Sequence, residues 1–247
     1  MNFIVQKING ELILDFCQEL RNSQRYWEWR GNPFSIMYVE KEVPKGLDNP
    51  DDYIPIGTIE FVKSYVNYYY PNKTECLKPI NIPDSLIPYA GRSIFNIKSV
   101  SDISEHTNKI IGTGTSKIFR KSLNVIKDPT NGIIEYHSSN DIIGYQISDI
   151  IPNIESEWRV FVHNNQIKQV CYYSGDPLSF PDSNTLRRLI NDWYKDPPVA
   201  YTLDVYTTNI GTYVMEVHRF FSCGLYGFSD PSLPYMFSQE WFEMMNL

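Results

Sequence analysis

The sequence predicts an α+β protein built largely from antiparallel sheets, and three observations support this fold class. Residues 157–163 and 167–173 read as two strands joined by Asn164-Asn165, a pair that suits a tight hairpin turn. A second pair of strand-like segments follows at 201–206 and 212–218. A short amphipathic helix is also expected near the N-terminus, where apolar residues recur at helical spacing.

The first region, residues 1–88, is predicted to be a small α/β unit. Asn9 is a plausible N-cap for its helix, and residues 34–40 read as a strand. Four prolines make residues 71–88 an irregular connection to the next lobe. The apolar face of the helix is formed by residues at i, i+3, i+4 and i+7: Ile13, Phe16, Cys17 and Leu20.

Two further lobes follow. Residues 89–150 are predicted to form a small lobe of antiparallel sheet, with a strand at 92–100. Residues 151–247 are predicted to form a larger lobe that contains both hairpins and a helix with Ser183 as its N-cap. The buried stripe of that helix, which ends before Pro197-Pro198, is Leu186, Leu189, Ile190 and Trp193.

Composition narrows the function classes. The 247 residues suffice for two or three lobes with sizeable cores. A formal net charge of −7 argues against broad nonspecific binding of nucleic acid, which favours basic proteins. Four widely spaced cysteines without a CxxC pair predict free thiols in a reducing compartment. We expect a cytoplasmic protein, because neither a signal peptide nor a membrane-length apolar run is visible.

The last predicted hairpin brings two carboxylates together. If Tyr206 and Thr212 form an opposed pair, Asp204 lies opposite Val214 and diagonal to Glu216, about 7–8 Å away at the backbone. Both carboxylates then share one face of the sheet. Because they repel each other unless a cation lies between them, this arrangement favours a Mg²⁺ site completed by phosphates.

His218 shares the face of the two carboxylates and is the third candidate metal ligand. The ordinary alternative for all three side chains is a solvated strand face. Asp is depleted in strands, however, and two carboxylates that converge in an apolar hairpin favour a functional site.

Cationic residues elsewhere suit phosphate. Arg159, two residues after Glu157 on a predicted strand, offers a planar fork of donors. Lys98 closes an apolar strand, and Lys109 precedes a Gly- and Thr-rich turn at 112–115 whose amides could cradle phosphate oxygens. Taken singly, each has an ordinary alternative: an ion pair on a wet face or a lysine that reaches solvent.

Taken in order, these segments resemble the ATP-grasp superfamily over residues 92–227. The likeness is greatest to the clade named for two arginines and a lysine, found largely in phages, large DNA viruses and bacteria. The segments that carry it are Lys98, the Lys109–Gly114 turn, Glu157–Val162, Tyr201–Val205, Met215–His218 and Ser222–Tyr226.

The resemblance implies a fold in which two antiparallel-sheet lobes clasp a nucleotide, preceded by an α/β region. It assigns Mg²⁺ to Asp204, Glu216 and His218, with Mn²⁺ as an alternative because imidazole is a poor ligand for magnesium. It places Arg159 and Arg219 at the reacting groups. The residues it assigns to ATP are Lys98, Lys109, Gln146, Ser148, Ile150 and Glu157.

The activity implied is an ATP- and Mg²⁺-dependent ligase that makes an acyl phosphate from a carboxylate, which an amine or thiol then captures. The acceptor is left open as a small molecule, a peptide or a protein. Two alternatives stay open beside it. One is a metal-dependent nuclease using Asp204, Glu216 and His218, and the other is an ATP-grasp binding protein without catalysis.

Overall fold

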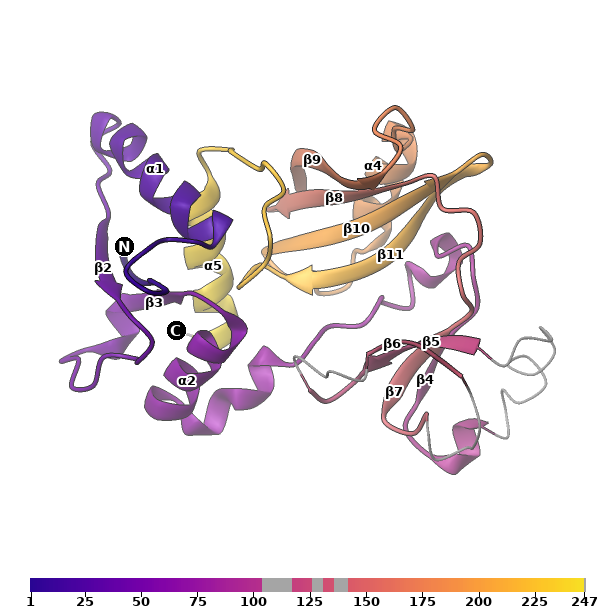
Figure 1. Cartoon of the computed structure of the whole chain (residues 1–247), viewed down its shortest axis with the longest axis horizontal. Helices are drawn as coiled ribbons and strands as arrows, with labels where there is room; N and C mark the ends of the chain where they lie inside the picture. The colour runs from indigo at the N-terminus through magenta and orange to yellow at the C-terminus, as the bar shows by residue number, and fades with distance from the viewer. Residues whose placement is uncertain (104–116, 126–130, 136–141, 247) are drawn as a thin grey trace.

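The computed structural model describes residues 1–103, 117–125, 131–135 and 142–246 (Figure 1). Lys109, expected to contact phosphate, lies outside the described residues. Within them the chain forms one parallel and two antiparallel sheets. The predicted α+β class is therefore confirmed.

The N-terminal unit is a three-stranded parallel sheet flanked by helices. Its strands are β1 (Asn2–Gln6), β2 (Ser35–Val39) and β3 (Tyr53–Ile56), in the order β2-β1-β3. Helix α1 (Asp15–Trp29) connects β1 to β2, and α2 (Ile59–Tyr69) follows β3. Helix α2 begins at Thr58, whose side chain accepts a hydrogen bond from the Phe61 amide.

Helix α1 confirms most of the predicted apolar face. Phe16, Cys17 and Leu20 are buried, but Ile13 precedes the helix and is 55% exposed. The predicted cap is wrong, because Leu14 holds the N-cap position and Asn9 lies in a turn with φ of 55°. Asn tolerates this left-handed conformation better than most residues do, which suits it to a turn.

The small lobe is a four-stranded antiparallel sheet. Its strands are β4 (Ile94–Ile97), β5 (Lys117–Ser122), β6 (Gly132–Glu135) and β7 (Tyr145–Ser148), in the order β4-β7-β5-β6. The irregular connection before it contains short 3-10 turns at Pro71–Leu77 (η2) and Ile87–Tyr89 (η3); another, η1, spans Pro50–Asp52.

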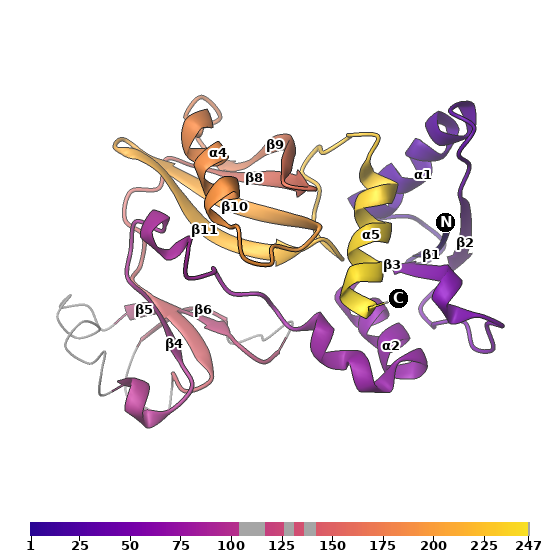
Figure 2. The same ribbon diagram turned by 180° about the vertical axis from the view of Figure 1, so that it is seen from behind.

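The larger lobe is a second antiparallel sheet with a helix on one face (Figure 2). It contains β8 (Ser156–His163), β9 (Gln166–Gly175), β10 (Ala200–Thr208) and β11 (Gly211–Arg219), in the order β11-β10-β8-β9. The first hairpin was predicted with its turn correctly placed, since Asn164 and Asn165 both have positive φ.

Helix α4 (Ser183–Asp192) covers one face of this sheet, and its predicted buried residues pack there with apolar strand residues. Its N-cap is Asp182 rather than the predicted Ser183: the Asp182 carboxylate accepts a hydrogen bond from the Thr185 amide at 2.7 Å. A carboxylate at this position also suits the positive end of the helix dipole.

The last hairpin differs from the predicted register. Thr207, not Tyr206, lies opposite Thr212, and a bulge follows between Asp204 and Val205. Asp204 therefore lies directly opposite Glu216 rather than diagonal to it. The predicted opposition of Asp204 and Val214 was wrong because the turn is tighter than expected and one extra residue on β11 is left unpaired.

The C-terminal helix α5 (Leu233–Met245) returns to the N-terminal unit. Its buried side chains belong to the same apolar cluster as β1, α1 and α2. The division at residues 88 and 150 remains a proposal, and the core of the first unit includes the end of the chain. No helix in the described part of the chain is long and apolar enough to cross a membrane.

Candidate active site

A row of charged residues crosses three neighbouring strands of the larger lobe. Arg159 on β8 is the cross-strand partner of Asp204 on β10, and Asp204 is the partner of Glu216 on β11. Arg159 and Asp204 are both buried. The side chains of this row contact one another, whereas Val160, Leu203 and the other apolar strand residues pack with α4. The sheet thus has one structural face and one charged face.

Arg159 is held by three kinds of contact. Its Nε and Nη2 donate to the two Asp204 carboxylate oxygens at 2.8 and 2.7 Å, and Nη1 donates to the Gly224 carbonyl at 3.0 Å. The guanidinium carbon lies 5.0 Å from the centre of the Tyr226 ring. Burial alone would lower the Arg159 pKa, but the Asp204 hydrogen bonds and charge outweigh burial and raise it. Arg159 and Asp204 therefore form a fixed ion pair.

Glu216 joins the two lobes electrostatically. The Lys121 Nζ of β5 lies 3.5 Å from its Oε2, and His218 Nε2 lies 2.9 Å from the same oxygen. His218 Nε2 is also 3.9 Å from Asp204 Oδ2. Burial opposes ionisation of Glu216, yet the Lys121 charge and the His218 hydrogen bond together hold its pKa well below the usual range. The predicted convergence of Asp204, Glu216 and His218 is thus present.

The donor atoms of this row suit a metal bound partly by substrate. Among the described residues, no group of three or more His, Cys, Asp or Glu side chains forms a complete protein cage. Mg²⁺ does not need one, because it is commonly bound by one or two carboxylates together with waters and substrate phosphates. Asp204 and Glu216 supply two such oxygen ligands from directly opposed positions. These residues fit Mg²⁺, whereas the His218 imidazole is the weaker donor for it.

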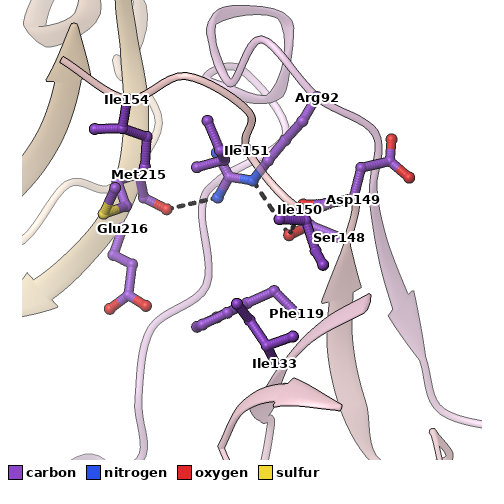
Figure 3. Close-up of a pocket in the computed structure, with 10 residues that line it drawn as sticks. All are labelled: Arg92, Phe119, Ile133, Ser148, Asp149, Ile150, Ile151, Ile154, Met215 and Glu216. Atoms are coloured by element: carbon purple, nitrogen blue, oxygen red, sulfur yellow. Dashed lines mark hydrogen bonds between the residues drawn. The ribbon is translucent and has the colours of Figure 1, made fainter. Parts of the chain in front are cut away.

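A cavity of about 210 Å³ opens between the two antiparallel sheets, beside this row (Figure 3). Segment 148–151, which leaves β7, forms one wall, and β11 forms another. Glu216 is the carboxylate where the cavity meets the charged row. The other walls are mostly apolar: Phe119, Ile133, Ile150, Ile151, Ile154 and Met215.

Arg92 fixes the geometry between the sheets. Its guanidinium donates to the carbonyls of Val214 and Met215, each at 2.8 Å, and its Nε donates to Ser148 Oγ at 3.2 Å (Figure 3). Met215 is the residue that the β11 bulge leaves unpaired. Burial lowers the Arg92 pKa. This side chain therefore ties the bulge, which sets the position of Glu216, to the strand that leaves the small lobe.

A second cavity, of about 230 Å³, lies on the other side of the charged row. It shares Arg159 and His218 with the row, and Arg219 also lines it. The N-terminal unit and the connection after it supply the opposite wall, from Ile59 and residues 77–80. The charged row therefore separates an apolar cavity between the sheets from a more polar cavity against the N-terminal unit.

The residues predicted to bind the nucleotide divide into two groups. Ser148 and Ile150 line the cavity between the sheets. Gln146 is buried beside it, and its side chain donates to Asn96 Oδ1 at 2.8 Å. Lys98 is exposed after the end of β4, and neither Lys98 nor Glu157 lines either cavity.

Sequence reasoning missed Lys121 and Arg92. A signal for Lys121 was available, since a lysine that interrupts strand-like sequence in a small lobe resembles the feature for which Lys98 was singled out. The choice between the two depends on which strand faces the other sheet. That follows from the order β4-β7-β5-β6, which local sequence does not give.

A family model matches residues 91–233, more than half of the chain. It describes an ATP-grasp domain, family 2 of the clade whose label abbreviates two arginines and a lysine. The matched range contains the charged row and the residues that line the cavity between the sheets. The comparison with curated proteins gives no match.

Solved structures share the fold at low identity. A D-cycloserine synthetase is 10% identical, with 98% of this chain and 99% of that chain covered and a TM-score of 0.50. A D-alanine–D-alanine ligase from Bacillus anthracis is 9% identical, covering 100% and 99%, with a TM-score of 0.49. An ATP-grasp RimK domain protein from Sphaerobacter thermophilus is 14% identical, covering 100% of both chains, with a TM-score of 0.45.

Proposed function

We propose, because this chain belongs to family 2 of that clade of ATP-grasp domains, that it is an ATP-dependent ligase that activates a carboxylic acid as an acyl phosphate. The observation that carries the proposal is the cavity between the two antiparallel sheets. Its apolar part suits a purine, and it ends at Glu216, which contacts Lys121 of the other sheet.

The nucleotide is assigned to this cavity by its lining. Phe119 and Ile133 come from the small lobe and Met215 from the larger one, so a flat base would lie between the two sheets. Segment 148–151 passes the same space and offers backbone groups to the edge of the base. The phosphates would then extend toward Lys121, whose ammonium supplies a compensating charge at the end of the cavity.

Asp204 and Glu216 would hold Mg²⁺, which when bound supplies positive charge to the phosphate oxygens. Arg159 keeps Asp204 oriented through its two hydrogen bonds and adds a permanent positive charge beside the phosphoryl group. His218 and Arg219 lie toward the second cavity. We assign them to the acid substrate rather than to the nucleotide.

The reaction proposed has two steps. A carboxylate oxygen attacks the γ-phosphorus of ATP, and the bond from that phosphorus to the β,γ-bridging oxygen breaks, so that ADP leaves with the electron pair. An amine nitrogen or thiol sulfur then attacks the acyl carbon. The carbon–oxygen bond to phosphate breaks, and phosphate and one proton are released. Positioning and charge stabilisation account for catalysis without a protein nucleophile.

Hydroxylamine tests this function because it captures acyl phosphates as hydroxamates. The protein is incubated with ATP, Mg²⁺, a panel of carboxylic acids and hydroxylamine, and both ADP and hydroxamate are measured. We expect equal amounts of ADP and hydroxamate with at least one acid, and neither product from Lys121→Met. Cleavage of a DNA or RNA substrate by the same preparation, with no ADP formed, would instead support the nuclease alternative.

A nucleotide-binding protein without turnover is the second candidate, and one observation favours it. Both carboxylates of the row are already paired with protein cations, Asp204 with Arg159 and Glu216 with Lys121. A protein of this kind would bind an ATP analogue in the same cavity yet release no ADP with any acid in the panel.

A further inference from the structure

The second cavity has a definite composition. Ile59, Leu77 and Ile80 give it an apolar wall from the N-terminal unit and the connection that follows. The loop after β11 forms the facing wall, where the Ser222 hydroxyl donates to the Gly57 carbonyl at 2.7 Å. That bond joins the two walls, so the cavity is formed before any ligand enters.

The charges at this cavity are of one sign. Lys78, Arg159 and Arg219 line it, whereas no Asp or Glu side chain does so among the residues that the structure describes. Each cation has a carboxylate partner away from the lining: Glu75, Asp204 and Glu240, respectively. The hydrogen bonds described for Arg219 use Nη1, which leaves its other nitrogens to face the cavity.

We propose that this cavity binds a carboxylic acid that has an apolar stem and carries no free ammonium group next to the carboxyl. The proposal rests on the function proposed above and names the substrate class for the acid. Arg219 and Lys78 attract the carboxylate, and the wall of Ile59, Leu77 and Ile80 takes the stem. An α-ammonium group would meet cations and no carboxylate, which disfavours free amino acids.

The position of the cavity fits this role. Arg159 and His218 line it and also contact Asp204 and Glu216, which face the proposed nucleotide cavity. A carboxylate held against these two residues would therefore lie beside the transferred phosphoryl group. The first unit of the chain, whose role the sequence left open, thus supplies half of the acid-binding wall.

Direct binding tests the substrate class. Titration calorimetry compares N-acetyl-leucine, leucine and leucinamide, which share one stem and differ in charge, each with and without Mg²⁺ and a nonhydrolysable ATP analogue. We expect N-acetyl-leucine to bind at least tenfold more tightly than leucine, and leucinamide to show no heat of binding. Leucine bound as tightly as N-acetyl-leucine, or leucinamide bound at all, would overturn the proposal.

A charge reversal locates the binding. Lys78→Glu places a carboxylate at the cavity, and its matched control is Lys63→Glu on the exposed side of α2. We expect Lys78→Glu to weaken N-acetyl-leucine binding at least tenfold and Lys63→Glu to leave it unchanged. Equal affinities in the two variants would place the acid elsewhere.

The ATP analogue separates the two proposals. Acid bound in this pattern by a protein that does not bind the analogue would overturn the ligase function and leave the acid site standing. Analogue binding with no discrimination among the three leucine compounds would do the reverse.

Discussion

Lys121 is the residue that carries charge from one sheet to the other. It is buried, on a strand of the small lobe, and its ammonium meets Glu216 of the larger lobe. Lys98, singled out from the sequence, is exposed after the end of its strand. The structure therefore favours Lys121 as the lysine for the phosphates.

A pair of substitutions compares the two lysines. We expect Lys121→Met to raise the dissociation constant of an ATP analogue at least tenfold, about 1.4 kcal/mol, because it removes a buried positive charge from the end of the cavity. Lys98→Met is expected to change it less than twofold. Calorimetry on both variants decides between them, and a larger effect from Lys98→Met would contradict this assignment.

Glu240 gives the protein a pH-dependent stability. It is fully buried, and burial raises its pKa from 4.5 to about 7 despite the opposing charge of Arg219. Because the folded-state pKa lies above the unfolded one, this residue favours folding most at low pH, and that contribution is lost as pH rises through 7.

Glu240→Gln removes the titrating group and keeps a hydrogen-bond acceptor for Arg219. Relative to this variant, we expect the wild-type free energy of unfolding to fall by about 3 kcal/mol between pH 4.5 and pH 7. Urea unfolding of both proteins across this range gives the difference. A constant difference would mean that Glu240 stays ionised.

Much of the metal site could be predicted at the residue scale, since strand parity alone placed Asp204, Glu216 and His218 on one face. Lys121 and Arg92 could not be chosen in the same way. Their importance comes from contacts between sheets, which depend on strand order and on the path between the lobes rather than on local sequence.

At the element scale, the last hairpin shows how a wrong register kept the correct face. Its two-residue turn at 209–210 places Thr207 opposite Thr212, and continuing that pairing would set Asp204 opposite Met215. A one-residue slip of this kind moves side chains to the other face. The bulge at Met215 restores Glu216 to the partner position of Asp204, and Arg92 holds the bulge through the Met215 carbonyl.

Helix α4 supports the sheet from its other face, and its cap can be tested. Asp182→Ala removes the acceptor for the Thr185 amide, and we expect it to lower the free energy of unfolding by about 1 kcal/mol. Asn184→Ala, at an exposed position in the first turn, is the matched control and should have a smaller effect. Denaturant unfolding measures both, and equal losses would argue against the capping role.

At the scale of the whole molecule, the two ends of the chain form one unit. Trp241 of α5 is 2% exposed and packs against Tyr65 and Tyr70 from the N-terminal unit. The sequence did not predict this because amphipathic helices indicate a buried face and not the partner that covers it. The second cavity depends on the same arrangement, since the N-terminal unit supplies one of its walls.

Two tryptophans test this packing. We expect Trp241→Ala to cost about 3–5 kcal/mol of unfolding free energy, as large-to-small substitutions in cores do. Trp29, which is 78% exposed at the end of α1, provides the control, and Trp29→Ala should change stability by about 0.5 kcal/mol or less. Similar losses in the two variants would contradict a shared core of α5 and the N-terminal unit.

The central claim is a nucleotide–metal site at Asp204 and Glu216. Its most direct test is calorimetric titration of a nonhydrolysable ATP analogue with Mg²⁺ into the wild type and Asp204→Asn/Glu216→Gln, which keeps the side-chain shapes and removes both charges. Glu42→Gln/Asp48→Asn, at exposed positions, is the matched control. We predict that the wild type and the control bind alike and that the site variant binds at least tenfold more weakly. Equal affinity in all three proteins, or no binding by the wild type with either Mg²⁺ or Mn²⁺, would contradict the claim.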